Sequence, residues 1–558
     1  MLSDKHPMIA GRTDLEQLVN RSRMLGADKT LVVHGGGNTS SKTREQDHLG
    51  RERDVLRVKG SGTDLKTIGA DGFPGLYLDE LLPLRERGAM SDEDMVAYLA
   101  RCMVEPGSRN PSIETLLHAF LPARHVDHTH ADAICVLTNT PEGQRHVRAA
   151  LGDDVAIVPY SRPGFGLSRE VAQLADASAV VLAWHGLVTW GDTHEASYQR
   201  TLDLVQRAET YLAQFPAPEP VVREDLSEKE IEALLLELRG LLSRDGRRVL
   251  HVDRSQREIA DRSDVDAVAA RRGTPDHMLR IGTKSLALNN LNRVAEEVAA
   301  FEDEYRGYVA RHQHLLPPGL KAMSALPRIV LVPGLGVIAT GPDAKTAKMN
   351  AEISARSHAV TARALDAFGA TDWLSEDEVF DFDYWPLELR KLQSAPPPRP
   401  LSGHVVLLAG ADSSYAPQVA QRLAADGAHL VLSGEDAARL EQVRADLPSG
   451  NAVVAGSDPA SDAILAFGGV DVLIALEPVE SALLANATDA MQRQGLGGVL
   501  VGVRSGNEKA LPEPDPAEGI RRNDVAIAAD SDPSLVAEAI AFLASSRSST
   551  TNGATLPA

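Results

Sequence analysis

The chain of 558 residues carries 57 lysine and arginine residues against 78 aspartate and glutamate residues, a net charge of −21. An acidic excess of this size argues against nucleic-acid binding and against adhesion to an anionic membrane. At about 150 residues per domain, the length predicts three or four units.

Residues 1–26 lack the apolar core of a signal peptide, and no stretch reaches the roughly 18 consecutive apolar residues of a spanning helix. The two cysteines, Cys102 and Cys135, are too few for a disulfide framework in a chain of this size. We therefore expect a cytoplasmic protein without membrane or nucleic-acid partners.

The N-terminal part mixes predicted helices with short predicted strands. Helices are expected at 14–26 and 112–123 from the helical spacing of apolar residues. Apolar runs predict four strands, at 30–37, 124–130, 156–161 and 179–190. Helices and strands interspersed in this way indicate an α/β layered domain.

Two glycine-rich stretches come early in this part, "VVHGGGNTSSK" at 32–42 and "RVKGSGTDLK" at 57–66. Glycine lets backbone amides approach an anion closely, and a nest of amides with a hydroxyl group binds phosphate. Ordinary turns have the same composition, so each stretch alone is open between a turn and a phosphate site. Neither contains the phosphate-binding pattern G-x-x-x-x-G-K-[ST].

The segment "NPSIETLLHAF" at 110–120 predicts the start of a helix. Pro111 suits the first turn, and Ser112 suits a capping hydroxyl. Glu114 then lies in the first turn, where the helix dipole stabilises an acid without any catalytic role. His118, one turn later, is placed to pair with it.

The segment "HVDHTHADAI" at 125–134 holds three histidines within six residues. In a strand, residues two apart point to the same side, so His128 and His130 share a face and His125 points away. We expect His125 to be a surface or capping residue. The pair could converge on a metal ion, or could form a solvated, hydrogen-bonded patch.

A third histidine, His185, stands in "LAWHGLVTWG", where one strand gives way to the next beside Gly186. An imidazole at a strand end is accessible to an ion, whereas one within a strand of valine and leucine needs a specific partner. Three histidines leave a tetrahedral ion one open position, as in catalytic metal sites.

The segments 180–196 and 329–347 share an apolar strand, a glycine, a second short strand and a glycine turn. Their alignment places Leu335 opposite His185, and "PDHML" at 275–279 echoes "VDHTH" while retaining only His277. The similarity is either a duplication whose second copy has lost its metal ligands and serves packing or assembly, or a chance likeness of apolar strands.

Two proline-containing stretches divide the chain. Residues 213–230 separate one helix from the next, and "SAPPPRP" at 394–400 is a semi-rigid linker. We therefore expect units at 1–220, 221–393 and 401–544. The tail at 545–558 is small, polar and aperiodic, which predicts disorder.

The motifs "GGGNTS", "KGSGTDL", "PSIETLLH", "HTH" and "WHGLVTWG" occur in this order and with these spacings. On these motifs, residues 15–215 resemble the class II aldolase/adducin family. The whole chain resembles the bifunctional rhamnulose-phosphate aldolase/short-chain dehydrogenase type, since "PRIVLVPGLGVIATG" and "FDFDYWPLELRKL" are similar to its longer members. The resemblance implies a class II aldolase-type α/β/α layered domain, a second related domain and a C-terminal Rossmann-like domain.

The resemblance also implies the site. It implies a divalent ion, usually zinc, on His128, His130 and His185, and it matches Glu114 to the family's catalytic acid/base. A further set matches the positions that hold the substrate phosphate: Gly37, Asn38, Ser61, Gly62 and Ser112. Ile113 departs from the family, which commonly has a second hydroxyl residue there, and this weakens the expected grip on a phosphate. Relatives form tetramers, so a homo-oligomer is expected.

Residues 404–436 resemble the first β-α-β unit of a short-chain dehydrogenase. That family's cofactor loop reads T-G-x-x-x-G-x-G, but only Gly410 remains here, with Ser414 and Ala416 at the later glycine positions. Tyr415 is the one tyrosine after residue 400 and lies in this loop, so no Tyr-x-x-x-Lys catalytic pair exists. We expect a degenerate domain that has lost NAD(P) binding and serves assembly or regulation.

These inferences predict a metal-dependent aldolase that cleaves a ketose 1-phosphate, with rhamnulose 1-phosphate as the first substrate to test. Cleavage beside a ketone leaves an enediolate, whose charge a divalent ion can stabilise while Glu114 moves a proton. The alternatives are a sugar-phosphate epimerase or related lyase on the same fold, and a non-catalytic scaffold like adducin, which lacks the metal histidines.

Overall fold

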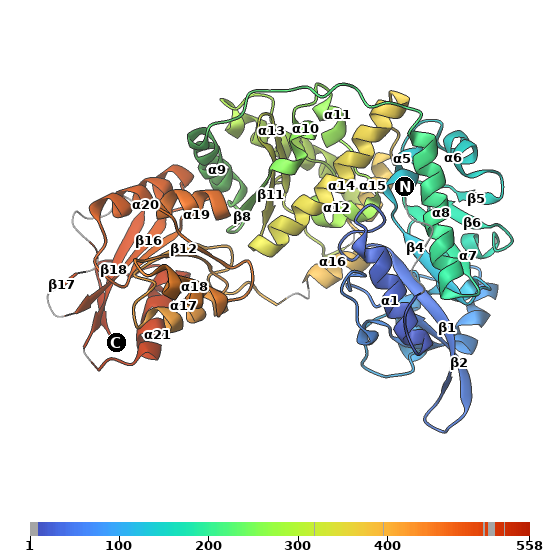
Figure 1. The fold of residues 1–558 in the computed structure, drawn as a ribbon, viewed down its shortest axis with the longest axis horizontal. Coiled ribbons are helices and arrows are strands. Elements are labelled where there is room, and N and C mark those ends of the chain that lie inside the picture. Colours follow the sequence, from blue (N-terminus) through green and yellow to red (C-terminus); the bar gives the residue numbers. More distant parts are fainter. Residues whose placement is uncertain are drawn as a thin grey trace.

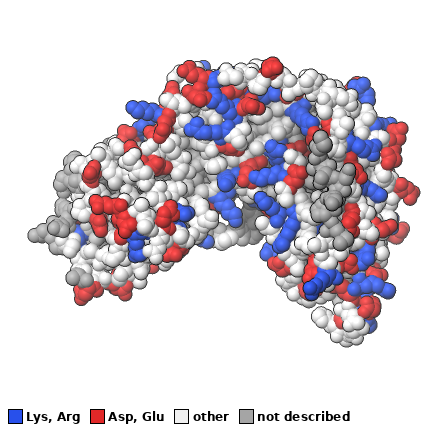
Figure 2. Space-filling view, in the orientation of Figure 1, with Lys and Arg blue, Asp and Glu red and all other residues white. Residues whose placement is uncertain are grey.

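The structure is a computed structural model that describes residues 9–316, 318–393, 396–505, 508–509, 511, 519–528 and 530–558. Its three sheets lie along an arch that has the N-terminal part at one end and the C-terminal part at the other (Figure 1). No helix in these ranges is both long and apolar enough to cross a membrane. Lysine and arginine side chains gather in the hollow of the arch (Figure 2), so the acidic excess is unevenly distributed.

The N-terminal sheet has seven strands in the order β3-β2-β1-β4-β7-β6-β5. Neighbouring strands are antiparallel, except that β5 and β6 are parallel. The strands are β1 (Asn38–Gln46), β2 (Glu52–Val58), β3 (Gly75–Tyr77), β4 (His125–Thr129), β5 (Val155–Val158), β6 (Ala179–Leu182) and β7 (Gly186–Gly191). The histidine-bearing strand β4 therefore occupies the middle of the sheet.

Helices cover both faces of this sheet. Alternate residues of β6 belong to different cores: Val181 packs into the cluster under α5, α6 and α8, and Val180 packs into the cluster with α4 and α7. The helices of this part are α1 (Asp14–Ala27), α2 (Leu78–Leu81), α3 (Asp92–Arg101), α4 (Thr115–Phe120), α5 (Asp132–Thr138), α6 (Gly143–Leu151), α7 (Phe165–Ala172) and α8 (His194–Leu212). The expected α/β/α layering is confirmed.

Strand β1 differs from the sequence prediction. The apolar segment 30–37, predicted as a strand, forms turns, and the polar segment Asn38–Gln46 is the strand instead. Thr39 and Ser41 are buried there because their hydroxyls are satisfied by Ser22 and His125. Hydrogen bonding thus lets a polar sequence occupy a buried strand, which apolar periodicity does not reveal.

The middle sheet has four strands in the order β8-β11-β10-β9. They are β8 (Val249–Asp253), β9 (Leu286–Ala287), β10 (Ile329–Val332) and β11 (Gly336–Gly341). The accompanying helices are α9 (Glu228–Leu242), α10 (Arg257–Ala260), α11 (Val265–Ala269), α12 (Pro275–Ile281), α13 (Val294–Arg311), α14 (Ala344–Phe368), α15 (Glu376–Asp383) and α16 (Pro386–Gln393). Helix α14 packs on β8 and β11 and also on α5, so it joins the middle and N-terminal parts.

The internal similarity corresponds to a shared local structure. In both places a strand, a tight turn, an antiparallel strand and a long helix follow one another, as β6-β7-α8 and as β10-β11-α14. The turns match in detail, since Trp184 has φ +58° and Gly334, at the aligned position, has φ +77°. Leu335, opposite His185, is buried in the apolar core. The position aligned with His185 therefore serves packing in the turn between β10 and β11.

The likeness between "PDHML" at 275–279 and the histidine segment "VDHTH" does not extend to the structure. The segment 275–279, expected to echo the histidine strand, lies in helix α12, where Pro275 occupies the first turn and Thr274 is the N-cap residue. Proline at the first helical position is favoured because its missing N–H would have no partner there. The short likeness to "VDHTH" therefore carries no strand.

The C-terminal sheet has the order β14-β13-β12-β15-β16-β18-β19, with β17 paired to β16. Its strands are β12 (Val405–Ala409), β13 (His429–Ser433), β14 (Ala452–Val454), β15 (Val472–Ala475), β16 (Gly498–Ser505), β17 (Glu508–Lys509), β18 (Ile520–Ile527) and β19 (Thr555–Pro557). Its helices are α17 (Ala416–Ala425), α18 (Ala437–Ala445), α19 (Pro459–Phe467), α20 (Ser481–Gln494) and α21 (Pro533–Ala544). All pairs along the main path are parallel, and the strand order reverses beside β12. This is a doubly wound, Rossmann-like sheet.

The prediction that residues 545–558 are disordered is wrong. Residues 545–558 form a short 3₁₀ turn at Ser546–Ser548 and then strand β19, which pairs in parallel with β18. The tail is held by its backbone and by side-chain bonds such as Arg521 to Ser548. Edge pairing requires little apolar character, so composition did not reveal it.

The C-terminal sheet is docked firmly on the middle part. Arg239 of α9 and Asp471, just before β15, form an ion pair in which the two side chains are 0% and 1% exposed. The guanidinium also donates to Gln494 Oε1 at 3.0 Å and to the carbonyl of Gly403 at 3.1 Å. One apolar cluster continues across this contact, from α9 and β8 into β12 and β15.

Candidate active site

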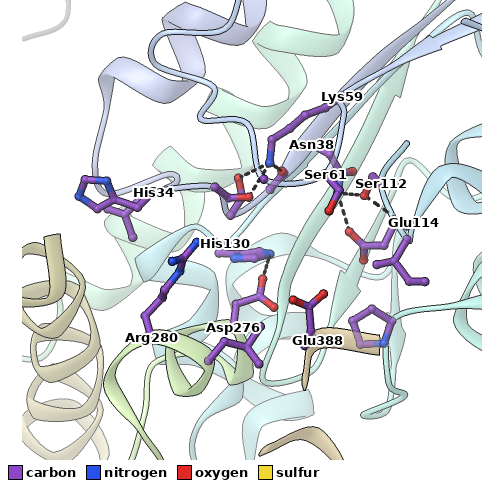
Figure 3. Close-up of a pocket in the computed structure, with 18 of the residues that line it drawn as sticks. His34, Asn38, Lys59, Ser61, Ser112, Glu114, His130, Asp276, Arg280 and Glu388 are labelled. Atoms are coloured by element: carbon purple, nitrogen blue, oxygen red, sulfur yellow. Dashed lines mark hydrogen bonds and ion pairs between the residues drawn. The ribbon is translucent and has the colours of Figure 1, made fainter. Parts of the chain in front are cut away.

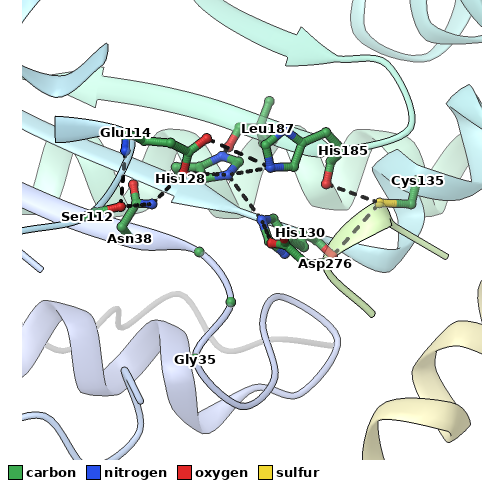
Figure 4. A network of polar contacts seen from close by, with 12 residues as sticks. Gly35, Asn38, Ser112, Glu114, His128, His130, Cys135, His185, Leu187 and Asp276 are labelled. Atoms are coloured by element: carbon green, nitrogen blue, oxygen red, sulfur yellow. Dashed lines mark hydrogen bonds and ion pairs between the residues drawn. The ribbon is translucent and has the colours of Figure 1, made fainter. Parts of the chain in front are cut away.

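The structure brings His128, His130 and His185 together. Nε2 of His128 lies 3.1 Å from Nε2 of His130 and 3.3 Å from Nε2 of His185 (Figure 4). All three side chains are buried, and their nitrogens form one mutually close group. The expected sharing of a face by His128 and His130 thus holds, with His130 placed directly after the end of β4.

Local backbone geometry delivers the third imidazole. His185 lies in the turn between β6 and β7, next to Trp184 with φ +58° and Gly186 with φ +159°. A Cβ on Gly186 would lie 2.1 Å from the carbonyl oxygen of Thr129. Only glycine lets the turn approach β4 this closely, and the approach sets His185 beside His128.

These three side chains suit a metal ion chemically. Nitrogen ligands about 2.1 Å from a tetrahedral ion lie roughly 3.4 Å apart, close to the observed spacing. His128 Nδ1 lies 3.1 Å from the carbonyl of Leu187, to which it can donate, leaving Nε2 free to bind an ion. Burial lowers the pKa of His185 to about 4 and that of His130 well below its usual value, so both are neutral ligands at pH 7.

Glu114 lies on one side of this histidine trio. Its Oε2 is 3.6 Å from His128 Nε2, and its Oε1 is 3.8 Å from His185 Nε2. It is the N-cap residue of α4 rather than a first-turn residue, and its side chain is buried. Asn38 Nδ2 donates to Oε2 at 2.6 Å, whereas Oε1 is buried without a hydrogen-bond partner. An unsatisfied buried oxygen facing the imidazoles is available to substrate or to a proton.

The charge state of Glu114 is set by opposing effects. Burial would raise the pKa of Glu114, but His128, His185 and the Asn38 amide outweigh burial and hold that pKa below its usual value. Glu114 is therefore ionised at neutral pH and can act as a base. The predicted pairing of Glu114 with His118 is not seen, because His118 bonds Ser40 Oγ at 2.7 Å and also Asn38.

The expected phosphate-binding residues line the same cavity, of about 340 Å³. They come from the two glycine stretches and from the turn before α4: Gly37, Asn38, Ser61, Gly62 and Ser112. Ser112 Oγ accepts from the Asn38 amide and from the backbone N–H of Glu114, both at 3.3 Å. Both glycine stretches are thus parts of one site.

Sequence reasoning missed the role of Lys59 in shaping this site. Its buried ammonium donates to the carbonyls of Gly35, Gly36 and Gly37 and so fastens the first glycine loop (Figure 3). Burial lowers the pKa of Lys59 to about 8. A lysine engaged by three carbonyls is a structural clamp on the loop rather than a free anion ligand.

The opposite wall comes from the middle part of the chain. Asp276 and Arg280 of α12, Trp385 and Glu388 line the cavity across from the glycine loops (Figure 3). Asp276 Oδ2 lies 3.1 Å from His130 Nε2. Burial, with a smaller contribution from Glu114, raises the pKa of Asp276 to about 7. The cavity is therefore composite. Asp276 lies in the stretch "PDHML", and Trp385 and Glu388 lie in "FDFDYWPLELRKL", but neither stretch was assigned to the site from sequence.

His125 points to the other side of the sheet, as predicted, but it is buried rather than at the surface. The centroid of its ring lies 3.9 Å from that of His194, with the two rings tilted by 37°, and the two histidines form a group with Asp14. Arg21 donates to His194 Nδ1 at 2.8 Å. A metal-bound histidine normally donates from its second nitrogen, so the guanidinium makes this group a poor ion site and a good structural one.

The loop after β12, at residues 410–416, corresponds to the dinucleotide-binding loop of Rossmann-type sheets but differs from it in sequence. The Asp412 carboxylate accepts hydrogen bonds from the backbone N–H groups of Glu435 and Asp436, both at 2.8 Å, across the end of β13. At Gly410, with φ +71°, a Cβ would lie 3.1 Å from Glu477. Acidic side chains thus stand at the carboxyl ends of the strands, where doubly wound sheets place their ligands.

A layered α/β sheet with these convergent histidines, joined through a second part to a doubly wound parallel sheet, defines an aldolase-type protein with a Rossmann-like C-terminal part. Residues 16–212 match the family model of the class II aldolase and adducin N-terminal domain, and residues 229–392 match that of the aldolase class II second domain. The chain belongs to the class II aldolase and adducin family.

Three individual proteins illustrate the similarity. An uncharacterized oxidoreductase, YuxG of Bacillus subtilis (strain 168), is 34% identical over 498 residues, covering 82% of this chain and 72% of that protein. The N-terminal class II aldolase domain of a conserved Thermoplasma acidophilum protein is 43% identical, covering 38% of this chain and 100% of that one, with a TM-score of 0.36. A short-chain type dehydrogenase/reductase from Mycobacterium marinum is 17% identical over 28% of this chain and 94% of its own, with a TM-score of 0.24.

Proposed function

We propose that the protein is a metal-dependent aldolase that cleaves a ketose 1-phosphate, such as rhamnulose 1-phosphate, into dihydroxyacetone phosphate and an aldehyde. The observation that carries the proposal is the convergence of three buried imidazoles beside the ionised Glu114, with Nε2 of His128 lying 3.1 Å from that of His130 and 3.3 Å from that of His185. Three ligands leave one position of a tetrahedral ion open to substrate, as catalytic zinc sites require.

His128, His130 and His185 would hold the divalent ion, for which zinc is the first candidate. A bound ion of this kind supplies Lewis-acid polarisation of the ketone and stabilises the enediolate charge. Burial favours this role, because charges interact more strongly where water is excluded.

Glu114 supplies the proton transfer in this proposal. As a carboxylate with one unpaired oxygen facing the trio, it can take a proton from the substrate and return it to the carbon of the cleaved fragment. Asn38 fixes the orientation of the carboxylate through Oε2. Glu114, as the acid/base group, and the histidine trio therefore lie beside one another at the same cavity.

The glycine loops would hold the phosphate end of the substrate. Backbone amides near Gly37 and Gly62, with the hydroxyls of Ser61 and Ser112, form the polar wall beside Glu114. Ile113 offers no hydroxyl there, so we propose that backbone amides supply most of the phosphate binding.

We propose that the C-terminal sheet contributes assembly or regulation and does not bind NAD(P). The altered glycine loop, the position of Asp412 and the lack of a Tyr-x-x-x-Lys pair support this. A cytoplasmic location and a homo-oligomeric state also stay proposals, resting on the sequence. Light scattering of the purified chain tests the oligomeric state.

The test is a retro-aldol assay of the full chain on ketose 1-phosphates, after chelation and then with each divalent ion added back. The proposal expects dihydroxyacetone phosphate to be released only with an ion present, and fastest with the preferred substrate. An ion-dependent change in the sugar without carbon–carbon cleavage would favour the epimerase or related lyase instead. No reaction with any ion or sugar would leave the scaffold role.

A further inference from the structure

Asp276 is positioned by the same segments that position the histidine trio. Helix α5 begins two residues after His130, and its C-cap residue is Asn139, whose side-chain amide donates to the carbonyl of Gly273 at 3.0 Å. The backbone N–H of Gly273 donates to Ser357 Oγ of α14, also at 3.0 Å. The start of α12, and with it Asp276, is thus fixed against the N-terminal part and does not depend on a free loop.

The carboxylate of Asp276 lies on the other side of the trio from Glu114. It contacts His130 at 3.1 Å, whereas Glu114 contacts His128 and His185. Its side chain is 31% exposed, and that surface faces the cavity (Figure 3). Among the described residues its only ion-pair contact is with His130, so most of its acceptor capacity is directed at whatever fills the cavity.

Two structural roles for Asp276 fit the geometry poorly. The group that orients a metal-bound histidine bonds the nitrogen that faces away from the ion, but Asp276 sits at Nε2, the nitrogen turned toward the other two imidazoles. Nor does Asp276 belong to the mutually close group of possible ligand atoms formed by the three histidines. It lies beside the site for an ion rather than in it.

Resting on the proposed function, we propose that Asp276 is a positioning and specificity residue that binds a hydroxyl group on the aldehyde side of the bond that breaks. The phosphate end would lie against the glycine loops beside Glu114, so the far end of a ketose chain extends toward α12 (Figure 3). A carboxyl group keeps an oxygen that accepts hydrogen bonds whether or not it is protonated, and the donors that a sugar offers are its hydroxyls. The substrate class is therefore a ketose whose aldehyde product carries a hydroxyl next to the carbonyl.

The experiment runs the reaction as aldol addition, with dihydroxyacetone phosphate and two aldehydes that differ by one hydroxyl, 2-hydroxypropanal and propanal. The wild-type enzyme is expected to prefer the hydroxylated aldehyde in kcat/KM by about 10- to 100-fold, the range of one hydrogen bond to a charged group. Asp276→Ala should lower that preference to below about threefold. Asp276→Asn, a weaker acceptor of the same shape, should give an intermediate preference.

Controls separate this role from a structural one. Asp266→Asn, on the exposed face of α11, should leave the preference at the wild-type value. Metal content should be the same in the wild type and in both Asp276 variants. Loss of the ion from both variants would overturn the inference, because Asp276 would then be a metal ligand. If Asp276→Ala keeps the wild-type preference, the inference about Asp276 is overturned but the proposed function is not. No product from either aldehyde with the wild type overturns the proposed function together with it.

Discussion

Replacing Glu114 by glutamine removes one proton acceptor while keeping the shape of the site. The new amide oxygen can still accept from Asn38 Nδ2, now 2.6 Å from Oε2, and the amide NH₂ can face the imidazoles 3.6 to 3.8 Å away. Because Glu114 is ionised in the native state, the substitution removes a negative charge but no packing. We therefore expect unfolding free energy to change by about 1 kcal/mol or less.

The effect on catalysis should be much larger. Loss of a positioned acid/base typically lowers the rate by 10²- to 10⁴-fold. At 1.36 kcal/mol per factor of ten, this raises the barrier by about 2.7 to 5.4 kcal/mol. The histidine ligands are untouched, so the ion should remain bound, and the loss should appear in kcat more than in KM.

The assay compares kcat for retro-aldol cleavage and metal content in wild type, Glu114→Gln and the exposed control Glu86→Gln. The control should match the wild type in both. If Glu114→Gln keeps more than a third of wild-type kcat, Glu114 does not transfer the proton. If it loses the ion, its role is in ligand binding instead, and the assignment of Glu114 as acid/base is refuted.

Three further predictions concern the framework. Asp471→Ala leaves Arg239 buried without its carboxylate partner. Thermal unfolding of the full chain should show a free energy of unfolding lower by about 3 to 5 kcal/mol. A decrease below about 1 kcal/mol would contradict the stabilising role of the ion pair. Gly186→Ala places a Cβ against the β4 backbone and should lower metal content, while Gly166→Ala, with open space around it, should not. Burial lowers the pKa of His358 to about 3. The folded chain then binds fewer protons than the unfolded chain below about pH 6.5, so stability present above that pH is lost on acidification. His358→Gln should reduce the loss between pH 7 and pH 5 by up to about 2 kcal/mol; an unchanged loss would exclude this titration.

The convergence of the three histidines could be predicted because it follows from local sequence patterns. Alternation along one strand pairs His128 with His130, and a glycine after His185 marks an accessible strand end. The strand-turn-strand structure shared by 180–196 and 329–347 could also be predicted, because both segments place apolar runs and glycines at the same spacing.

Other features depend on long-range contacts that no local pattern contains. Asp276 reaches His130 from 146 residues further along the chain, and its segment was noted only for its likeness to "VDHTH", although Pro275 favours a helix start. Strand β1 is polar because its hydroxyls find buried partners, and the tail is ordered because β18 offers an edge. Tertiary structure satisfied these polar groups, so composition alone pointed the wrong way.

Metal content is the most direct test of the central claim that His128, His130 and His185 hold an ion. Elemental analysis should compare the purified wild-type chain with His128→Ala and with His48→Ala, a histidine on the exposed surface. About one divalent ion per chain is expected in the wild type and in His48→Ala, and almost none in His128→Ala. A wild-type chain that takes up no divalent ion, or a His128→Ala chain that keeps a full ion, would contradict that claim.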